Sequence, residues 1–213
     1  MRVFSQRLGR LLLFGLLLAG VTALAGVCMR ILSGWVRLGA VTICNLVNGG
    51  LALLFLRLSG RRLAVSLRPA AQWLWALLLA GGLGMTIIVL PLLFGTSLVG
   101  RHADFVPWAA AVELFDNLLV IGPVEELIFR EYVQGELSTL LPKKTWLAVL
   151  LASALFGAWH LINGSPVQAL FTFGIGCAFG FARQYGKSCT YLSCALGHGL
   201  YDSLCSVTRW LLP

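Results

Sequence analysis

Residues 72–95 read QWLWALLLAGGLGMTIIVLPLLFG, a run of twenty-four residues without one charged side chain. About twenty apolar residues are enough for an α-helix to cross the hydrocarbon core of a bilayer. The whole chain of 213 residues is 59% hydrophobic and 11% charged, whereas soluble domains carry about 25% charged residues. The alternation of a barrel strand is absent, and helices satisfy their own backbone hydrogen bonds in lipid. The sequence therefore predicts an integral membrane protein whose spans are helices.

Hydrophobic segments of helical length recur on both sides of this run and predict an all-α fold, a polytopic transmembrane helical bundle of about seven spans. Residues 1–107 would form the N-terminal transmembrane helices and residues 108–213 the C-terminal ones, together one integral bundle. The predicted spans are 11–32, 38–58, 72–95, 108–140, 145–163, 167–185 and 189–211.

Basic residues are spread over the predicted loops, and the net charge is +8. With a cytoplasmic N-terminus, eleven of them fall on inner segments and four on outer segments, as the positive-inside rule requires. We therefore expect a multi-pass protein of a bacterial cytoplasmic membrane, with its N-terminus in the cytoplasm and no nucleic-acid partner. The first span resembles a signal peptide, and Ala23-Leu24-Ala25 resembles a cleavage site. In a polytopic protein such a segment normally serves as a retained anchor.

Acidic residues are concentrated instead of spread. Seven of the eight lie between Asp104 and Glu136, and the eighth is Asp202. An ionisable side chain in the membrane costs about 2.5–3.5 kcal/mol on insertion scales and indicates a functional site by default. The chemistry is therefore expected in the C-terminal half.

The first polar motif is GPVEELIFR, residues 122–130. Pro123 should kink or restart its helix, which would place Glu125 and Glu126 in a first turn near the positive end of a half-helix. Neighbouring residues diverge by about 100° around a helix, whereas Glu126 and Arg130 share a face and can pair. Glu125 then faces elsewhere and is the candidate general base. The alternative is a structural Glu–Arg pair with a spare neutral carboxyl.

The second motif places Phe156 one turn before His160, on the same helix face. Glu125 lies seventeen residues before Pro142, and His160 lies seventeen residues after Lys143. In a simple helical hairpin Glu125 and His160 would reach the same depth. A lone histidine of this kind would more often be a core residue, but this register favours a Glu–His pair.

The third motif is His198 with Asp202, again one turn apart on one face. Asp202 can set the tautomer and orientation of the His198 ring. A polar pair that joins two helices is an equally good reading of this motif alone.

Taken in order, EExxxR, FxxxH and HxxxD on successive hydrophobic segments resemble the CPBP family of intramembrane proteases. This family includes the type II CAAX prenyl endoprotease and bacterial proteins linked to bacteriocin processing and self-protection. The resemblance covers about residues 108–206. Glu131 departs from the pattern, since family members often have Gly after the Arg, and seven spans are predicted where eight are common.

The resemblance implies that Glu125 and His160 activate a water molecule and that His198 and Asp202 stabilise the oxyanion. Glu126, Arg130 and Phe156 would orient the catalytic helix and its neighbours. No cofactor is expected under this glutamate mechanism. The alternative is a zinc ion held by His160, His198 and Glu125, with an open position for water.

The resulting prediction is a hydrolase, an intramembrane endopeptidase that cleaves a membrane-anchored or lipidated protein or peptide. A proton- or ion-coupled transporter is the alternative, because buried Glu, His and Asp also build proton relays. A third reading is a non-catalytic membrane partner or immunity protein with the same fold.

Overall fold

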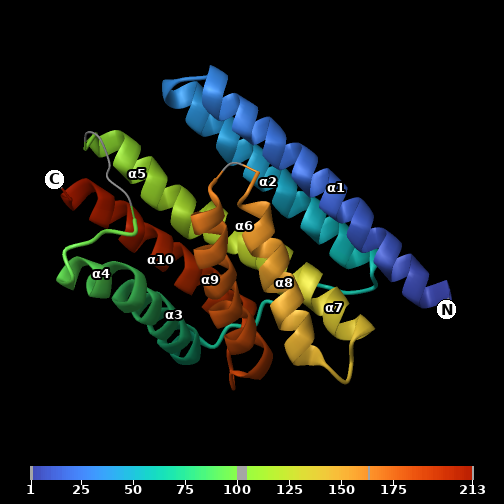
Figure 1. The fold of residues 1–213 in the computed structure, drawn as a ribbon. Coiled ribbons are helices and arrows are strands. Elements are labelled where there is room, and N and C mark those ends of the chain that lie inside the picture. Colours follow the sequence, from blue (N-terminus) through green and yellow to red (C-terminus); the bar gives the residue numbers. More distant parts are fainter. Residues whose placement is uncertain (1, 100–104, 163, 213) are drawn as a thin grey trace. The chain divides into compact units, whose positions relative to one another are not determined.

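The computed structural model describes residues 2–99, 105–162 and 164–212, and no strand occurs in these ranges. Seven uninterrupted helical stretches occur where seven spans were predicted, which confirms the all-α fold class (Figure 1). Apart from the first, which begins at Arg2, every end lies within four residues of the prediction. The elements are α1 (Arg2–Ile31), α2 (Gly34–Leu58), α3 (Pro69–Gly84), η1 (Met85–Val89), α4 (Leu90–Leu93), α5 (Pro107–Asp116), η2 (Asn117–Ile121), α6 (Gly122–Glu126), η3 (Leu127–Gln134), α7 (Gly135–Leu140), α8 (Thr145–Trp159), α9 (Pro166–Tyr185) and α10 (Tyr191–Leu211), where η marks a π-helical segment.

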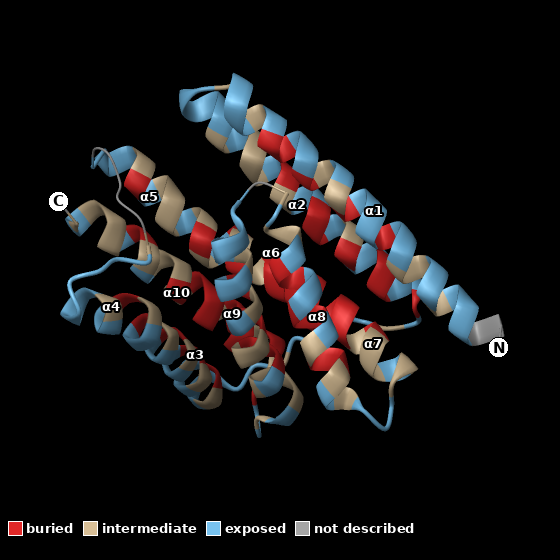
Figure 2. Ribbon diagram, in the orientation of Figure 1, coloured by how far each residue is buried: buried red, intermediate tan, exposed pale blue. Residues whose placement is uncertain are grey.

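Three of these stretches are long and apolar enough to cross a membrane, namely Phe4–Ile31, Gly34–Leu58 and Pro69–Leu93. Many large apolar side chains of these stretches are exposed. Figure 2 shows much of their ribbon in the pale blue of exposed residues. Leu12 and Leu16 of α1, for example, are 63% and 73% exposed. Such exposed apolar surface is stable against acyl chains but not against water. The chain is an integral membrane protein.

The chain forms two compact units, each assembled from two separate parts of the sequence. The first unit contains Met1–Ala64 and Val124–Lys187, and the second contains Val65–Pro123 and Ser188–Pro213. The predicted division at residue 108 followed the position of the motifs and stays a prediction.

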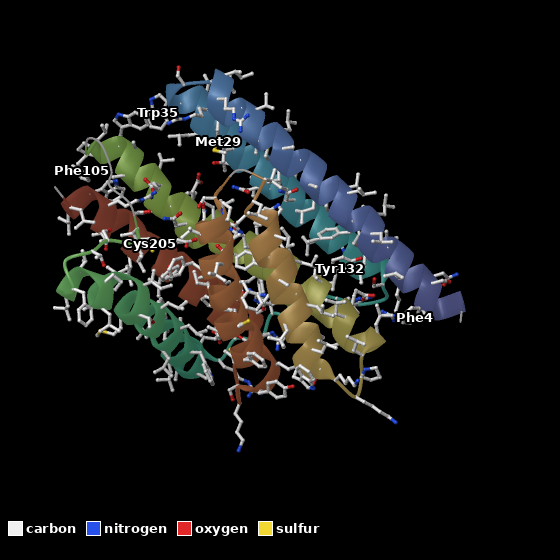
Figure 3. The ribbon with its side chains drawn as sticks, viewed as in Figure 1. Phe4, Met29, Trp35, Phe105, Tyr132 and Cys205 are labelled. Carbon is white, nitrogen blue, oxygen red and sulfur yellow. The ribbon has the colours of Figure 1, made fainter. Side chains whose placement is uncertain are left out.

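An aromatic cluster joins α1, α2 and η3 in the first unit. Phe14, Phe55 and Tyr132 are almost completely buried, and Tyr132 is labelled in Figure 3. The ring centroids of Phe14 and Tyr132 lie 4.6 Å apart, and those of Phe14 and Phe55 lie 5.4 Å apart, within the range of favourable aromatic pairs. The N-terminal helix pair is thereby packed onto the helical stretch that carries Glu125 and Glu126.

In the second unit, α10 packs against the last residues of the unit's first part, which ends at Pro123. A Cβ atom on Gly122 would lie 2.6 Å from the backbone nitrogen of Gly199 and 2.8 Å from the carbonyl oxygen of Ala195. The Tyr191 hydroxyl donates a 2.9 Å hydrogen bond to the carbonyl oxygen of Pro123. Only glycine fits at position 122, because the neighbouring atoms are backbone and cannot move aside.

Pro123 does not restart the helix, so this part of the prediction is wrong. The π-helical segment η2 leads directly into α6, and Gly122 has helical angles of φ −53° and ψ −54°. A wider turn before a proline relieves the clash of its ring with the preceding carbonyl group, and the helix continues. Glu125 and Glu126 consequently lie inside a helical stretch and not at a free N-terminus.

Candidate active site

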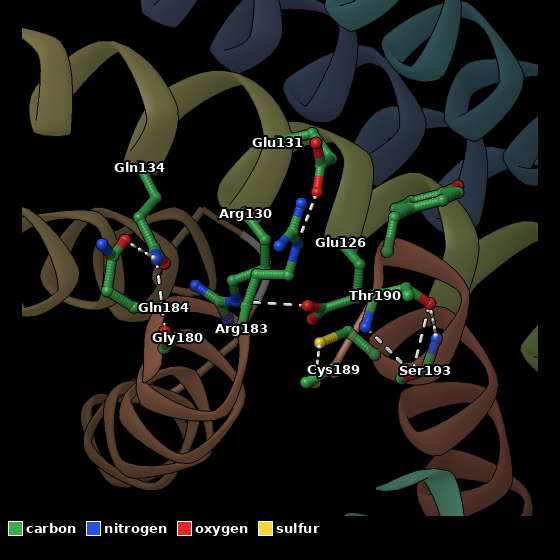
Figure 4. A network of polar contacts seen from close by, with 12 residues as sticks. Glu126, Arg130, Glu131, Gln134, Gly180, Arg183, Gln184, Cys189, Thr190 and Ser193 are labelled. Atoms are coloured by element: carbon green, nitrogen blue, oxygen red, sulfur yellow. Dashed lines mark hydrogen bonds and ion pairs between the residues drawn. The ribbon is translucent and has the colours of Figure 1, made fainter. Parts of the chain in front are cut away.

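Glu125, Glu126 and Arg130 lie on α6 and η3, and all three are buried in the first unit. Nε of Arg130 lies 3.2 Å from a carboxylate oxygen of Glu126, and both side chains are completely inaccessible (Figure 4). The predicted pairing one turn apart is thus confirmed. Because this pair engages Glu126, the two neighbouring carboxylates have different surroundings, as their angular separation requires.

The Arg130 guanidinium also lies over the face of the Phe156 ring, 5.2 Å from its centroid. Neither Nη1 nor Nη2 of Arg130 makes a hydrogen bond within the described part of the chain. The negative face of an aromatic ring attracts a cation, and this attraction is stronger away from water. Phe156 therefore offsets part of the hydration free energy that the Arg130 charge loses on burial.

His160 directly follows α8, which ends at Trp159, so it lies outside the helix in which it was predicted. Its ring is edge-on to the Phe156 ring at a centroid distance of 4.8 Å, as the sequence spacing predicted. Nδ1 lies 2.9 Å from the carbonyl oxygen of Phe156. A carbonyl oxygen only accepts, so Nδ1 carries the hydrogen and a neutral ring has its lone pair on Nε2. The fold thus selects one tautomer of His160.

The Trp159 indole, next to His160 in sequence, is held by residues of the N-terminal half that were not predicted as part of the site. Trp159 is 5.1 Å from the His160 ring, and its Nε1 donates a 2.7 Å hydrogen bond to the Thr22 hydroxyl. Thr22 donates in turn to the carbonyl oxygen of Leu18 and lies 3.4 Å from the side-chain amide of Asn48. Polar residues inside apolar spans were the available signal, but only ionisable groups were considered.

Polar side chains join α9 to η3, the segment that carries Arg130. Nε of Arg183 lies 2.7 Å from Glu131, and Gln134 donates to the carbonyl oxygen of Gly180 at 3.2 Å (Figure 4). A Cβ atom on Gly180 would lie 2.7 Å from Val149 of α8, so the glycine permits close helix packing. Glu131, which departs from the family pattern, here has a partner on α9.

His198 and Asp202 belong to the second unit and lie on α10. His198 is 3% exposed, and its Nε2 lies 3.6 Å from a carboxylate oxygen of Asp202. Both residues share a helix face, as the spacing predicted. This distance permits an ion pair when the ring is protonated.

The predicted site residues are therefore divided between the two units. The first unit brings together Glu126, Arg130, Phe156 and His160, and also contains the buried Glu125. The second unit brings together His198 and Asp202. The participation of both groups in one reaction stays a prediction.

A zinc ion would need at least three protein ligands. Among residues 2–99, 105–162 and 164–212, no three His, Cys, Asp or Glu side chains are grouped to hold a metal ion. Within its own unit, the set of Glu125 and His160 supplies only two ligands. The zinc alternative remains a prediction.

Residues 107–204 match the family model described as type II CAAX prenyl endopeptidase Rce1-like. The matched segment begins with α5, ends within α10 and contains all three motifs. The family resemblance that the motifs indicated is thereby confirmed for this segment. No curated protein and no solved structure matches the chain.

Proposed function

We propose that this chain, whose residues 107–204 match the model of a family of membrane proteases, hydrolyses a peptide bond in a membrane-anchored or lipidated protein. The family match supports proteolysis as the kind of activity. The observation that carries the residue assignment is the arrangement of Glu126, Arg130, Phe156 and His160. It holds a histidine of defined tautomer in the same unit as a second, separately placed carboxylate.

In the proposed reaction Glu125 accepts a proton from water while the water oxygen bonds to the scissile carbonyl carbon. Nε2 of His160 accepts a hydrogen bond from the same water and orients it. The carbonyl π electrons move to oxygen and form a tetrahedral oxyanion. The C–N bond then breaks as Glu125 returns the proton to the leaving amine. General base catalysis of this type contributes about 10²–10⁴-fold to a rate.

His198 would stabilise the oxyanion through a ring N–H, and Asp202 would orient the ring and balance its charge when it is protonated. The 3.6 Å separation of Nε2 and the carboxylate supports this pairing. Removal of one donor to an oxyanion typically costs about 10²–10³-fold in kcat.

The packing of Gly122 supports the placement of His198 within the second unit. Gly122 lies against the backbone at Gly199, next to His198 in sequence. This contact fixes the part of α10 that carries the proposed oxyanion donor.

The proposal is tested by terminal-peptide mass spectrometry of membranes that contain equal amounts of wild-type protein or Glu125→Gln. We expect a cleaved terminus that is present with wild type and absent with the variant. Glu113→Gln is the matched control, since Glu113 is another carboxylate of the same helical stretch and pairs with Arg209 and Ser206. Its membranes should retain the cleaved terminus.

Equal sets of termini from wild type and Glu125→Gln would overturn the proposed role of Glu125. The family match gives no support to the transporter alternative.

A further inference from the structure

An open cavity of about 830 Å³ lies at the end of α2 in the first unit. It contains no residue of the three motifs. Among the described residues, three of its lining side chains are basic and three are leucines, and the lining is Leu53, Leu56, Arg57, Gly60, Arg61, Arg62 and Leu63. The cavity therefore combines an apolar wall with a strongly cationic one.

The positive charge of this wall is only partly neutralised. Arg57 and Arg62 are exposed and form no ion pair with any other residue in the described ranges. Nη1 of Arg61 lies 3.9 Å from the buried carboxylate of Glu136, which is already paired with Arg7 at 2.8 Å. One carboxylate thus serves two arginines, and an anionic ligand would find a surplus of positive charge.

The Arg61 guanidinium is held in place at the cavity. A Cβ atom on Gly135 would overlap it, so the guanidinium lies directly on the backbone of α7. The Arg61 side chain as a whole is 32% exposed, and phosphate oxygens match the fork of a guanidinium. Arg61 therefore adds a fixed positive charge to the cationic wall.

The leucines identify the kind of anion. Arg57 lies in the last turn of α2, one of the candidate membrane spans, where lipid headgroups meet the protein. Leu53 is one turn earlier on the same face of α2, further from the helix end and toward the middle of the candidate span. A ligand that reaches both walls needs a phosphate joined to a long apolar chain. Basic pockets beside membrane helices bind such headgroups.

We propose that this cavity binds one anionic phospholipid, with its phosphate on Arg57, Arg61 and Arg62 and an acyl chain along Leu53, Leu56 and Leu63. The inference goes beyond the proposed proteolysis and does not depend on it. Bound lipid would neutralise the surplus positive charge of this wall and join the end of α2 to Arg61, which lies on α7.

The test is native mass spectrometry of the purified full chain in detergent, titrated with phosphatidylglycerol or with phosphatidylcholine of the same acyl chains. We expect one phosphatidylglycerol to bind more tightly than the rest, and no corresponding phosphatidylcholine. Arg57→Gln with Arg62→Gln should weaken the affinity for this lipid about 25-fold, since each basic residue contributes about fivefold. Both arginines are exposed, so the double variant is expected to fold.

The matched control is Lys143→Gln with Lys144→Gln, which removes two exposed charges from another turn of the same unit. Basic loops attract anionic lipid without any site, and this control measures that general effect. Equal weakening by both double variants, or equal binding of the two lipids, overturns the proposal. Inorganic phosphate is added as a third arm. If it displaces the tight lipid at low millimolar concentration, the cavity takes the free anion and the lipid assignment is wrong.

Discussion

The indole N–H of Trp159 donates a 2.7 Å hydrogen bond to the hydroxyl of Thr22, across 137 residues of sequence. Trp159 precedes His160, and their rings are in edge contact. Thr22 lies on α1, outside the segment that matches the protease family. The N-terminal helix therefore takes part in positioning a proposed catalytic histidine.

Replacement of Thr22 by Val keeps the side-chain shape but leaves the Trp159 N–H without this acceptor. An unsatisfied buried donor costs about 1–3 kcal/mol, so we expect lower stability to denaturation in detergent. Because the substrate contacts would remain, kcat should fall more than KM rises. Thr86→Val is the control, since within the described residues the Thr86 hydroxyl donates to the Gly82 carbonyl oxygen of its own helical stretch and to no other helix. A Thr22→Val protein with unchanged kcat would show that the hydrogen bond has no positioning role.

Replacement of Arg130 by Met leaves the fully buried Glu126 carboxylate without its partner. Breaking a buried ion pair by removing one member typically costs about 3–5 kcal/mol. The double variant Glu126→Gln with Arg130→Met removes the isolated charge and should recover much of this stability. Denaturant titration of both proteins measures the difference. If the double variant is no more stable than Arg130→Met, the isolated Glu126 carboxylate is not the cause of the lost stability, and the expectation is wrong.

Gly180→Ala introduces a Cβ atom only 2.7 Å from Val149 and 3.0 Å from the Gln134 amide oxygen. Overpacking of this kind costs about 1–3 kcal/mol, so we expect a lower midpoint of unfolding. Gly174→Ala on the same helix is the control, because nothing lies within 4 Å of its Cβ position. Equal midpoints for the two variants would contradict the close packing of α8 and α9.

Gly122→Ala should lower the rate of proteolysis and also destabilise the chain, because the backbone atoms around its Cβ cannot move aside. Its Cβ atom would lie within 2.8 Å of backbone atoms of Ala195 and Gly199, which flank His198. A displacement of about 1 Å at a catalytic group can lower a rate about 100-fold. Gly81→Ala, in the same unit and with open space around it, should leave cleavage unchanged. The number of cleaved termini found by mass spectrometry measures the activity of each variant. Full activity of Gly122→Ala would refute the proposed role of the contact between Gly122 and α10.

The proposed glutamate mechanism predicts that activity survives removal of metal ions. Prolonged dialysis of the purified chain against 1,10-phenanthroline should leave the cleavage rate unchanged, and elemental analysis should find less than one zinc per chain. Loss of activity that is restored by zinc, together with zinc at equal stoichiometry, would favour the set of Glu125, His160 and His198 instead.

Local sequence determined much of this protein. Apolar runs separated by Gly, Pro and basic residues predicted all seven helical stretches, because the length of a span and its turns depend on neighbouring residues. The pairs Glu126–Arg130 and His198–Asp202 followed from helical spacing, and so did the contact of Phe156 with His160. In each case the two residues are one helical turn apart, so the backbone itself brings them together.

The tertiary structure alone decided which distant residues support these pairs. The contact of Thr22 with Trp159, the pairing of Glu131 with Arg183 and the close approach of Gly122 to Gly199 join residues far apart in the chain. The sequence likewise did not reveal that Pro123 lies in a continuous helix or that His160 follows the end of α8. Such features depend on how side chains of different helices share space. Helical periodicity specifies which residues lie on one face, but only packing decides what that face meets.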